Sequence, residues 1–215
     1  VSLCAGKYIA TADQDDIWHL DKLQKLYIAL EQNPNAILAY CNSRFVDSKD
    51  DFLGQLMSDI IKMPSGGNLI EFFLNARIAG HAMLFDRVIA DNLPVLDDNC
   101  MAFDWMIVMS AVLLGNVVYV DELLVDYRKH GSSVTDAIKK NKKTEIKLLT
   151  TSLERLSENK SFNKKILRLK VAWNSWLKSY FNIAFPWLIF CYGASSVRKK
   201  ASRYFFGYRL KRIKY

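Results

Sequence analysis

Lys7-Tyr8-Ile9-Ala10-Thr11-Ala12, followed at once by Asp13-Gln14-Asp15-Asp16, is the stretch that indicates the fold most directly. Its first six residues form a short apolar run rich in β-forming residues, which predicts a buried strand. The acidic residues that follow would then lie at the carboxyl end of this strand. Because α/β sheets bind ligands outside the carboxyl ends of their strands, we expect this point to carry function.

The residues after the acidic stretch predict a helix and a second strand. Apolar side chains recur at helical spacing between Leu20 and Leu30, and Asn33-Pro34 ends the pattern. Residues 36–41 form another buried apolar run. Strand, helix and strand in close succession are typical of a βαβ unit, so we expect an α/β fold with a mostly parallel sheet.

The rest of the chain divides into an α/β part and a helical part. Pattern and turn residues predict a helix over 68–76, a strand over 80–85, a buried helix over 103–114 and a close pair of β runs over 117–120 and 123–127. Residues 136–158 are polar and helical in pattern. We therefore expect an α/β domain over 1–135 and a helical, basic, aromatic-rich extension over 136–215.

Charge is distributed very unevenly along the chain. The net charge is +8, yet residues 159–215 carry fourteen Lys or Arg and no Asp or Glu, which leaves 16 basic and 22 acidic residues, a net of −6, in residues 1–158. The first part would suit a cation site, and the second an anionic surface. The four cysteines lie far apart without a CxxC pair, which argues against a zinc knuckle and fits a reducing cytosol.

The basic, aromatic residues 159–215 allow three interpretations. Aromatic side chains interleaved with Lys and Arg are typical of a helix lying on an anionic membrane, which we favour. They also occur in grooves for single-stranded nucleic acid, the least favoured reading, and in a helical cap whose aromatic residues are core. The longest uncharged run, residues 179–197, contains Asn182, Pro186 and Gly193 and is a poor membrane-spanning helix.

The carboxylates of Asp13, Asp15 and Asp16 are candidate metal ligands. Hard divalent cations such as Mg²⁺ and Mn²⁺ prefer oxygen ligands and are commonly held by one or two carboxylates and the phosphates of a substrate. Carboxylates this close repel one another without a cation. The alternative is an acidic, solvated turn.

Three ordered blocks of sequence resemble one enzyme family. They are Ala5 to Ile9 leading into Asp13-Gln14-Asp15-Asp16-Ile17-Trp18, then Phe103-Asp104-Trp105, and then Tyr127-Arg128-Lys129-His130-Gly131-Ser132-Ser133-Val134. Together they resemble the family 2 inverting glycosyltransferases with the GT-A fold, in particular the rhamnosyltransferase-like members that build bacterial O-antigen and capsule. The resemblance covers about residues 1–135 and implies a Rossmann-like GT-A domain.

The resemblance also implies roles for individual residues. Asp104 would be the catalytic base, and Gly80, His81 and Trp105 would line the acceptor side. A divalent metal, Mg²⁺ or Mn²⁺, would be held by Asp15 first, with Asp13 and His130. The donor diphosphate would be bound by Asp13, Asp15, Asp16, Arg128 and His130.

The residues alone leave some of these roles open. Apolar neighbours would raise the pKa of Asp104 and a helix N-terminus would lower it, and an ordinary helix carboxylate is the alternative. His81 could equally be a buried imidazole with satisfied hydrogen bonds. Arg128 and His130 beside the flexible Gly131 could clasp a diphosphate, although a lone histidine is more often structural.

The expected function is inverting transfer of a sugar such as rhamnose from a nucleotide-diphosphate donor to a growing, lipid-linked bacterial surface polysaccharide. The enzyme would be cytoplasmic and peripheral on the inner face of the membrane, bound through residues 159–215, and we do not expect nucleic acid as a partner. The opening strands that end in Asp-Asp-Gly-Ser in this family do not occur in the sequence. We therefore expect a truncated, N-terminally incomplete domain, and the alternative is a non-catalytic membrane-binding remnant or partner of a glycosyltransferase.

Overall fold

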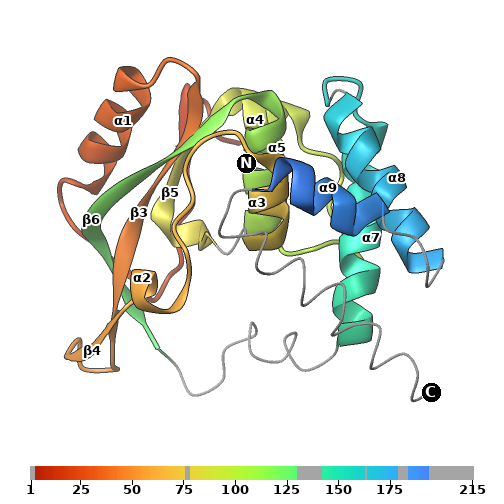
Figure 1. Cartoon of the computed structure of the whole chain (residues 1–215). Helices are drawn as coiled ribbons and strands as arrows, with labels where there is room; N and C mark the ends of the chain where they lie inside the picture. The colour runs from red at the N-terminus through yellow and green to blue at the C-terminus, as the bar shows by residue number, and fades with distance from the viewer. Residues whose placement is uncertain (1–2, 76–77, 130–141, 163, 179–183, 194–215) are drawn as a thin grey trace.

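The computed structural model describes residues 3–75, 78–129, 142–162, 164–178 and 184–193. Within them, helices and a six-stranded sheet form a mixed α/β fold (Figure 1). The sheet has the order β1-β5-β3-β6-β2, with β4 on the side of β3. The strands are β1 (Tyr8–Ala10), β2 (Ile17–Trp18), β3 (Ala36–Val46), β4 (Phe52–Leu56), β5 (Met83–Asp86) and β6 (Asn116–Arg128).

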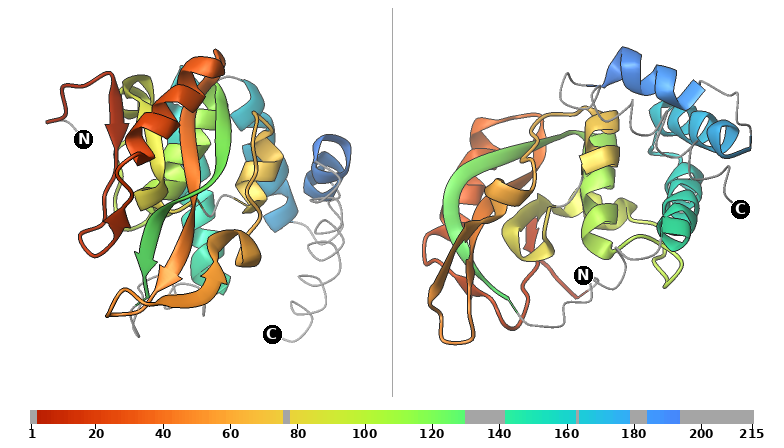
Figure 2. Two further views of the ribbon diagram at one scale, coloured as in Figure 1. Left: turned by 90° about the vertical axis from the view of Figure 1, so that its left-hand side faces the viewer. Right: turned by 60° about the horizontal axis from the view of Figure 1, so that its bottom comes forward.

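The direction of the strands differs from the expected mostly parallel sheet. Only β3 and β6 pair in parallel, while β5 pairs antiparallel with both β1 and β3, β2 with β6, and β4 with β3. The sheet is therefore mostly antiparallel and curled (Figure 2), and the parallel arrangement is not confirmed. The two strands of the predicted βαβ unit, β1 and β3, do run in the same direction, but β5 lies between them. Periodicity indicates strands without indicating which of them are neighbours, so this insertion could not be anticipated.

Both faces of the sheet are covered by helices. Side chains alternate between the faces of a strand, and along β3 Leu38 and Tyr40 enter one hydrophobic cluster while Ala39 and Cys41 enter another. Helix α1 (Lys22–Gln32) covers the smaller cluster with Leu26 and Leu30. Helices α3 (Leu69–Asn75) and α5 (Phe103–Leu114) cover the larger cluster on the opposite face (Figure 1).

Most predicted elements of the α/β part are present. Helix α5 has the bounds expected from the sequence, and α3 agrees within a residue or two. The predicted pair of β runs is one strand, β6, whose register against β3 shifts between Val120 and Leu123 and leaves Asp121 and Glu122 exposed. The predicted strand over 80–85 begins as a short 3-10 helix, η1 (Gly80–Ala82), before β5. Short helices α2 (Met57–Ile60) and α4 (Arg87–Asn92) complete this part.

The C-terminal helices form a further layer beyond α3 and α5 (Figures 1 and 2). We call α7 (Lys142–Glu158), α8 (Lys164–Lys178) and α9 (Ala184–Tyr192) the helical layer. Leu153, Trp173 and Phe185, one from each helix, are buried in the larger cluster together with Phe73 of α3. The inner side of the layer thus belongs to the core, as the cap interpretation expected. No described helix is both long and apolar enough to cross a membrane.

Candidate functional site

The acidic segment Asp13–Asp16 crosses one end of the sheet. It leaves β1 at one edge and enters β2 at the other edge, where β2 pairs with the last residues of β6. On this path it passes the carboxyl ends of β3 and β6 and the start of β5, because β5 runs antiparallel to its neighbours. Side chains from four separate segments therefore meet here, and we call Asp13, Asp16, His81, Asp104 and Arg128 the acidic corner.

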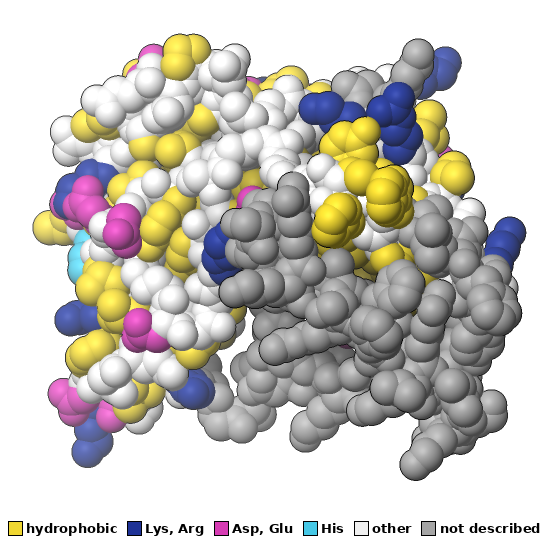
Figure 3. Space-filling view, viewed as in Figure 1, with side chains coloured by type: hydrophobic (Ala, Val, Ile, Leu, Met, Phe, Trp, Pro, Cys, Tyr) yellow, Lys and Arg dark blue, Asp and Glu magenta, His cyan; other side chains and the backbone are white. Residues whose placement is uncertain are grey.

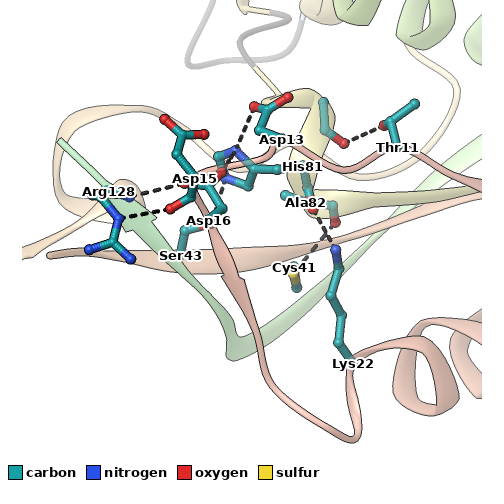
Figure 4. A network of polar contacts seen from close by, with 11 residues as sticks. Thr11, Asp13, Asp15, Asp16, Lys22, Cys41, Ser43, His81, Ala82 and Arg128 are labelled. Carbon is teal, nitrogen blue, oxygen red and sulfur yellow. Dashed lines mark hydrogen bonds and ion pairs between the residues drawn. The ribbon is translucent and has the colours of Figure 1, made fainter. Parts of the chain in front are cut away.

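His81 lies at the centre of the acidic corner (Figure 4). The residue is 1% exposed, and its ring stacks on Tyr127 with a centroid distance of 4.8 Å. Nδ1 lies 2.8 Å from Asp16 Oδ2 and 3.6 Å from Asp13 Oδ2, and Nε2 lies 3.2 Å from Ser43 Oγ. Burial alone would lower the pKa of His81, but the carboxylates of Asp13 and Asp16 outweigh it and raise this pKa above the usual histidine value.

The two carboxylates beside His81 differ in exposure. The Asp16 side chain is fully buried, whereas the Asp13 side chain is 47% exposed. Asp16 Oδ1 accepts a hydrogen bond from the backbone N–H of Arg128 at 3.0 Å, but Oδ2 has no aligned hydrogen-bond partner despite its short ion-pair contact with His81. A hydrogen bond with His81 lowers the pKa of Asp13, which burial opposes. One carboxylate therefore lies inside the protein and the other faces solvent.

These side chains fit a divalent cation. One oxygen from each of Asp13 and Asp16 and one nitrogen of His81 lie within 4.8 Å of one another. His81 Nδ1 and Asp16 Oδ2 already form an ion pair at 2.8 Å, so a cation bound here would take the place of the proton between them. The two carboxylate oxygens suit Mn²⁺ or Mg²⁺, whereas an imidazole nitrogen also suits softer divalent metals such as Zn²⁺.

Arg128 clamps the acidic segment to the turn between β3 and β4. Its Nε donates to the backbone oxygen of Asp15 at 2.9 Å, and Nη1 contacts the backbone oxygen of Asp47 at 3.3 Å and the carboxylate of Asp50. Asp50 has a φ of 70°, a left-handed conformation that is uncommon for a residue other than glycine. The guanidinium is thus already engaged by protein groups in this conformation.

A buried lysine lies beneath the acidic corner. Lys22, in the first turn of α1, is 0% exposed. Its ammonium donates to the backbone oxygen of His81 and lies 3.2 Å from the centroid of the Trp18 ring. Burial lowers the pKa of Lys22 to about 8, against the attraction of Cys41, Asp16 and Asp13. Lys22 therefore fixes the main chain that carries His81.

Asp104 approaches the same place from the start of α5. Burial raises the pKa of Asp104, and the nearby charge of Asp13 raises it further. The hydrogen bond that Asp104 Oδ1 accepts from the backbone N–H of Trp105, at 2.6 Å, opposes this rise. For this carboxyl, burial therefore outweighs the backbone hydrogen bonds at the start of α5. The start of α5 packs closely on η1, since a Cβ added at Gly80 would lie 2.8 Å from the Phe103 ring. Thr11 also donates to the Gly80 oxygen at 2.6 Å, which joins η1 to the strand that precedes Asp13.

The structure does not bring every predicted site residue into this cluster. Asp15, the first choice for metal ligation, contributes a backbone oxygen to the Arg128 clamp, and its carboxylate is not among the three clustered ligands. Trp105 is 5% exposed and packs against Phe73 at a centroid distance of 6.1 Å, in the core. His130 lies outside the described residues. The roles predicted for these three residues stay predictions.

Sequence reasoning missed Ser43, Lys22 and Tyr127 as parts of the site. Ser43 and Tyr127 lie on β3 and β6, and each contacts the His81 ring only because those strands end beside η1. Nothing in a single sequence indicates that meeting. Lys22 lies at the start of a helix, where an exposed lysine would be expected.

No protein-family model matches the chain, and no curated protein matches it.

Proposed function

We propose that this chain is the catalytic and acceptor part of an inverting glycosyltransferase that uses a nucleoside-diphosphate sugar. The observation that carries the proposal is the convergence of Asp13, Asp16, His81 and Asp104 at the end of the sheet. They come from three segments far apart in sequence, and all belong to the blocks that resemble GT-A enzymes or to the predicted acceptor region.

A divalent cation bound by Asp13, Asp16 and His81 would neutralise the charge that develops on the departing diphosphate. Asp13 is the exposed member of this set and would meet the diphosphate first. Lys22 and Ser43 would keep His81 in place through its backbone oxygen and its Nε2.

Asp104 would act as the base. Its carboxylate would take the proton of the acceptor hydroxyl as that oxygen forms the new bond to the anomeric carbon. The bond from this carbon to the diphosphate oxygen breaks on the opposite face, and the diphosphate leaves with the electron pair. The raised pKa of Asp104 suits this role, because a carboxylate of higher pKa is a stronger base.

A non-catalytic role is the second candidate, and the state of Arg128 favours it. Its guanidinium already contacts Asp50 and the backbone oxygens of Asp15 and Asp47. A donor diphosphate would have to displace Asp50 to use this side chain. In a non-catalytic remnant of a transferase, the acidic corner would stabilise the fold without catalysing transfer from a donor.

The test uses the full chain with Mn²⁺ and a panel of sugars linked to UDP, GDP and dTDP, offered with lipid-linked glycans extracted from bacterial membranes. Calorimetry measures donor binding, and released nucleoside diphosphate measures transfer. We expect binding and release with at least one donor. Asp104→Asn should lower release by about 10²- to 10⁴-fold while donor binding changes little.

Asp98→Asn, the same change in an exposed loop, is the matched control and should leave both quantities unchanged. Donor binding without release would support the non-catalytic role. If no donor binds in the presence of Mn²⁺, the glycosyltransferase proposal is wrong.

A further inference from the structure

Helix α9 is apolar on two opposite sides, and only one of them packs against the protein. Phe185 and Ile189 are 0% exposed and belong to the larger core cluster. Trp187, Phe190 and Tyr192 are 61%, 57% and 63% exposed. The helix contains no charged residue over Ala184–Tyr192. A cluster of large, exposed aromatic side chains often marks a site where a protein contacts a partner or a membrane.

The position of α9 is fixed by contacts on its inner side. Phe185 packs edge-on against Phe73 and Trp173, with ring centroids 5.9 Å and 5.1 Å away. Asn68 donates to the backbone oxygen of Tyr192 at 2.9 Å, which ties the end of α9 to the start of α3. The helix cannot rotate its exposed aromatics inward without losing these contacts. Trp187 and Phe190 also stack on each other at 5.9 Å, so they present one continuous surface.

The surroundings of this surface are basic. Figure 3 shows the hydrophobic side chains over α9 with Lys and Arg side chains beside them. The sequence from residue 159 onward contains fourteen Lys or Arg and no Asp or Glu, and Lys165 and Lys178 are exposed at the two ends of α8. A second copy of this chain would bring the same positive charge to the contact, whereas an anionic surface would be attracted to it.

We propose that the outer face of α9, formed by Trp187 and Phe190, docks on an anionic lipid bilayer. The aromatic side chains enter the boundary between headgroups and acyl chains, where Trp and Tyr are favoured. The basic residues of the helical layer lie against the anionic headgroups. The helix lies along the surface and its inner side stays packed on the core. This attachment does not depend on transfer activity. Vesicle binding can therefore fail while the proposed transferase function holds, and transfer can fail while vesicle binding holds.

The experiment is co-sedimentation of the full chain with vesicles of phosphatidylcholine containing phosphatidylglycerol, and with vesicles of phosphatidylcholine alone. We expect the chain to sediment with the anionic vesicles far more than with the neutral ones. Raising NaCl from about 0.05 to about 0.5 M should weaken binding without abolishing it, because salt screens the charges but not the apolar contacts.

Two double variants locate the contact. Trp187→Ser with Phe190→Ser should weaken partitioning to anionic vesicles by about tenfold or more. Phe52→Ser with Leu53→Ser on β4 removes two side chains that are about equally exposed elsewhere, 51% and 48%, and should leave partitioning unchanged. Both changes are on exposed positions, and far-ultraviolet circular dichroism checks that the variants are folded.

A probe on the same helix gives a second readout. Cys191 and Cys4 are the exposed cysteines, and Cys41 and Cys100 are buried. An environment-sensitive fluorophore on Cys191 in a Cys4→Ser variant should shift its emission to the blue when anionic vesicles are added. The same fluorophore on Cys4 in a Cys191→Ser variant should not shift.

The proposal is overturned if the chain does not sediment with anionic vesicles or if the α9 double variant partitions like the wild type. It is also overturned if the α9 changes only lower the molecular mass in solution, which would make this face a contact between copies. The bilayer is also rejected if a low concentration of single-stranded oligonucleotide releases the chain from vesicles and the α9 double variant no longer binds the oligonucleotide. Those two results together would identify nucleic acid as the partner of this face.

Discussion

The acidic corner and the helical layer are held together by different forces. In the acidic corner, buried or half-buried charges are fixed by short polar contacts such as those of His81 with Asp16 and of Arg128 with the backbone of Asp15. In the helical layer, Trp173 and Phe185 pack among other aromatic rings, and few charges are buried. Polar contacts of this kind are directional and sensitive to pH, whereas apolar packing is neither. The comparison indicates that the helical layer provides stability through apolar packing, while the acidic corner places charged groups where the proposed cation would bind.

The largest expected effect lies in the helical layer. Trp173 is 1% exposed, donates to Thr150 Oγ1 at 2.9 Å and contacts Phe73 and Phe185. Trp173→Ala should lower the free energy of unfolding by about 3–5 kcal/mol, because it opens a cavity in the core. Trp187→Ala, the same change on the exposed side of the layer, should change it by no more than about 0.5 kcal/mol. Urea denaturation measures both, and similar losses for the two tryptophans would contradict the assignment of α8 and α9 to the core.

An intermediate loss of stability is expected at Asp126, the β6 residue that pairs with Ile17 of β2. Asp126 is nearly buried, and its carboxylate accepts from Arg44 Nε and Nη2 at 2.6 and 2.8 Å and lies 3.0 Å from His19 Nε2. The bonds from Arg44 lower the pKa of Asp126, with burial opposing and His19 assisting. Asp126→Asn should therefore cost about 1.5–3 kcal/mol of unfolding free energy at neutral pH.

The pH dependence of this loss distinguishes the two regions. Because the folded-state pKa of Asp126 is lower than its value in the unfolded chain, its contribution is complete above the usual carboxyl pKa of 3.8 and is lost as the pH falls through the folded value. The difference between wild type and Asp126→Asn should shrink as the pH is lowered below about 4. The loss in Trp173→Ala should stay constant over the same range. Urea denaturation at a series of pH values measures both differences. If the difference in unfolding free energy between wild type and Asp126→Asn does not change with pH, ionised Asp126 does not stabilise the fold.

The smallest effect is expected at the clamp made by Arg128. Arg128→Gln removes the contacts with the Asp15 and Asp47 backbone oxygens and with Asp50, and should cost about 1–2 kcal/mol. Asp50→Asn removes only the exposed ion pair and should cost less than about 1 kcal/mol. Urea denaturation compares the two. Equal losses would mean that the ion pair, and not the backbone contacts, holds the acidic segment.

The sequence predicted much of the secondary structure but not the order of the strands, and of the predicted site residues the structure brings Asp13, Asp16, His81 and Asp104 together. The long apolar helix at residues 103–114 is where it was expected, because a strong local pattern determines it, whereas the predicted buried strand before Asp13 is a three-residue edge strand with only Ile9 buried. The insertion of β5 between β1 and β3 depends on long-range pairing, which leaves no local pattern. For the same reason the contacts of Ser43 and Tyr127 with His81 were missed.

The C-terminal helices show a different limit of sequence reasoning. Aromatic and basic residues alternate there in a way typical of both an interfacial helix and a packed cap. The structure places Trp173 in the core and Trp187 on the surface, so the same composition supplies both buried and exposed aromatic residues. Composition indicates that a helix is amphipathic, but it cannot tell which aromatic residues are covered by the protein itself.

Binding of Mn²⁺ to the acidic corner tests the central claim most directly. Paramagnetic resonance of free Mn²⁺ during titration of the full chain measures affinity and stoichiometry for the wild type, Asp13→Asn, Asp16→Asn and Asp15→Asn. Asp13 is half exposed, so its variant should fold normally, and Asp15→Asn is a neighbouring change of the same chemistry. We predict one saturable site, weakened by about tenfold or more in Asp13→Asn and Asp16→Asn and by less than about threefold in Asp15→Asn. The absence of saturable binding, or an equal loss in all three variants, would contradict the account.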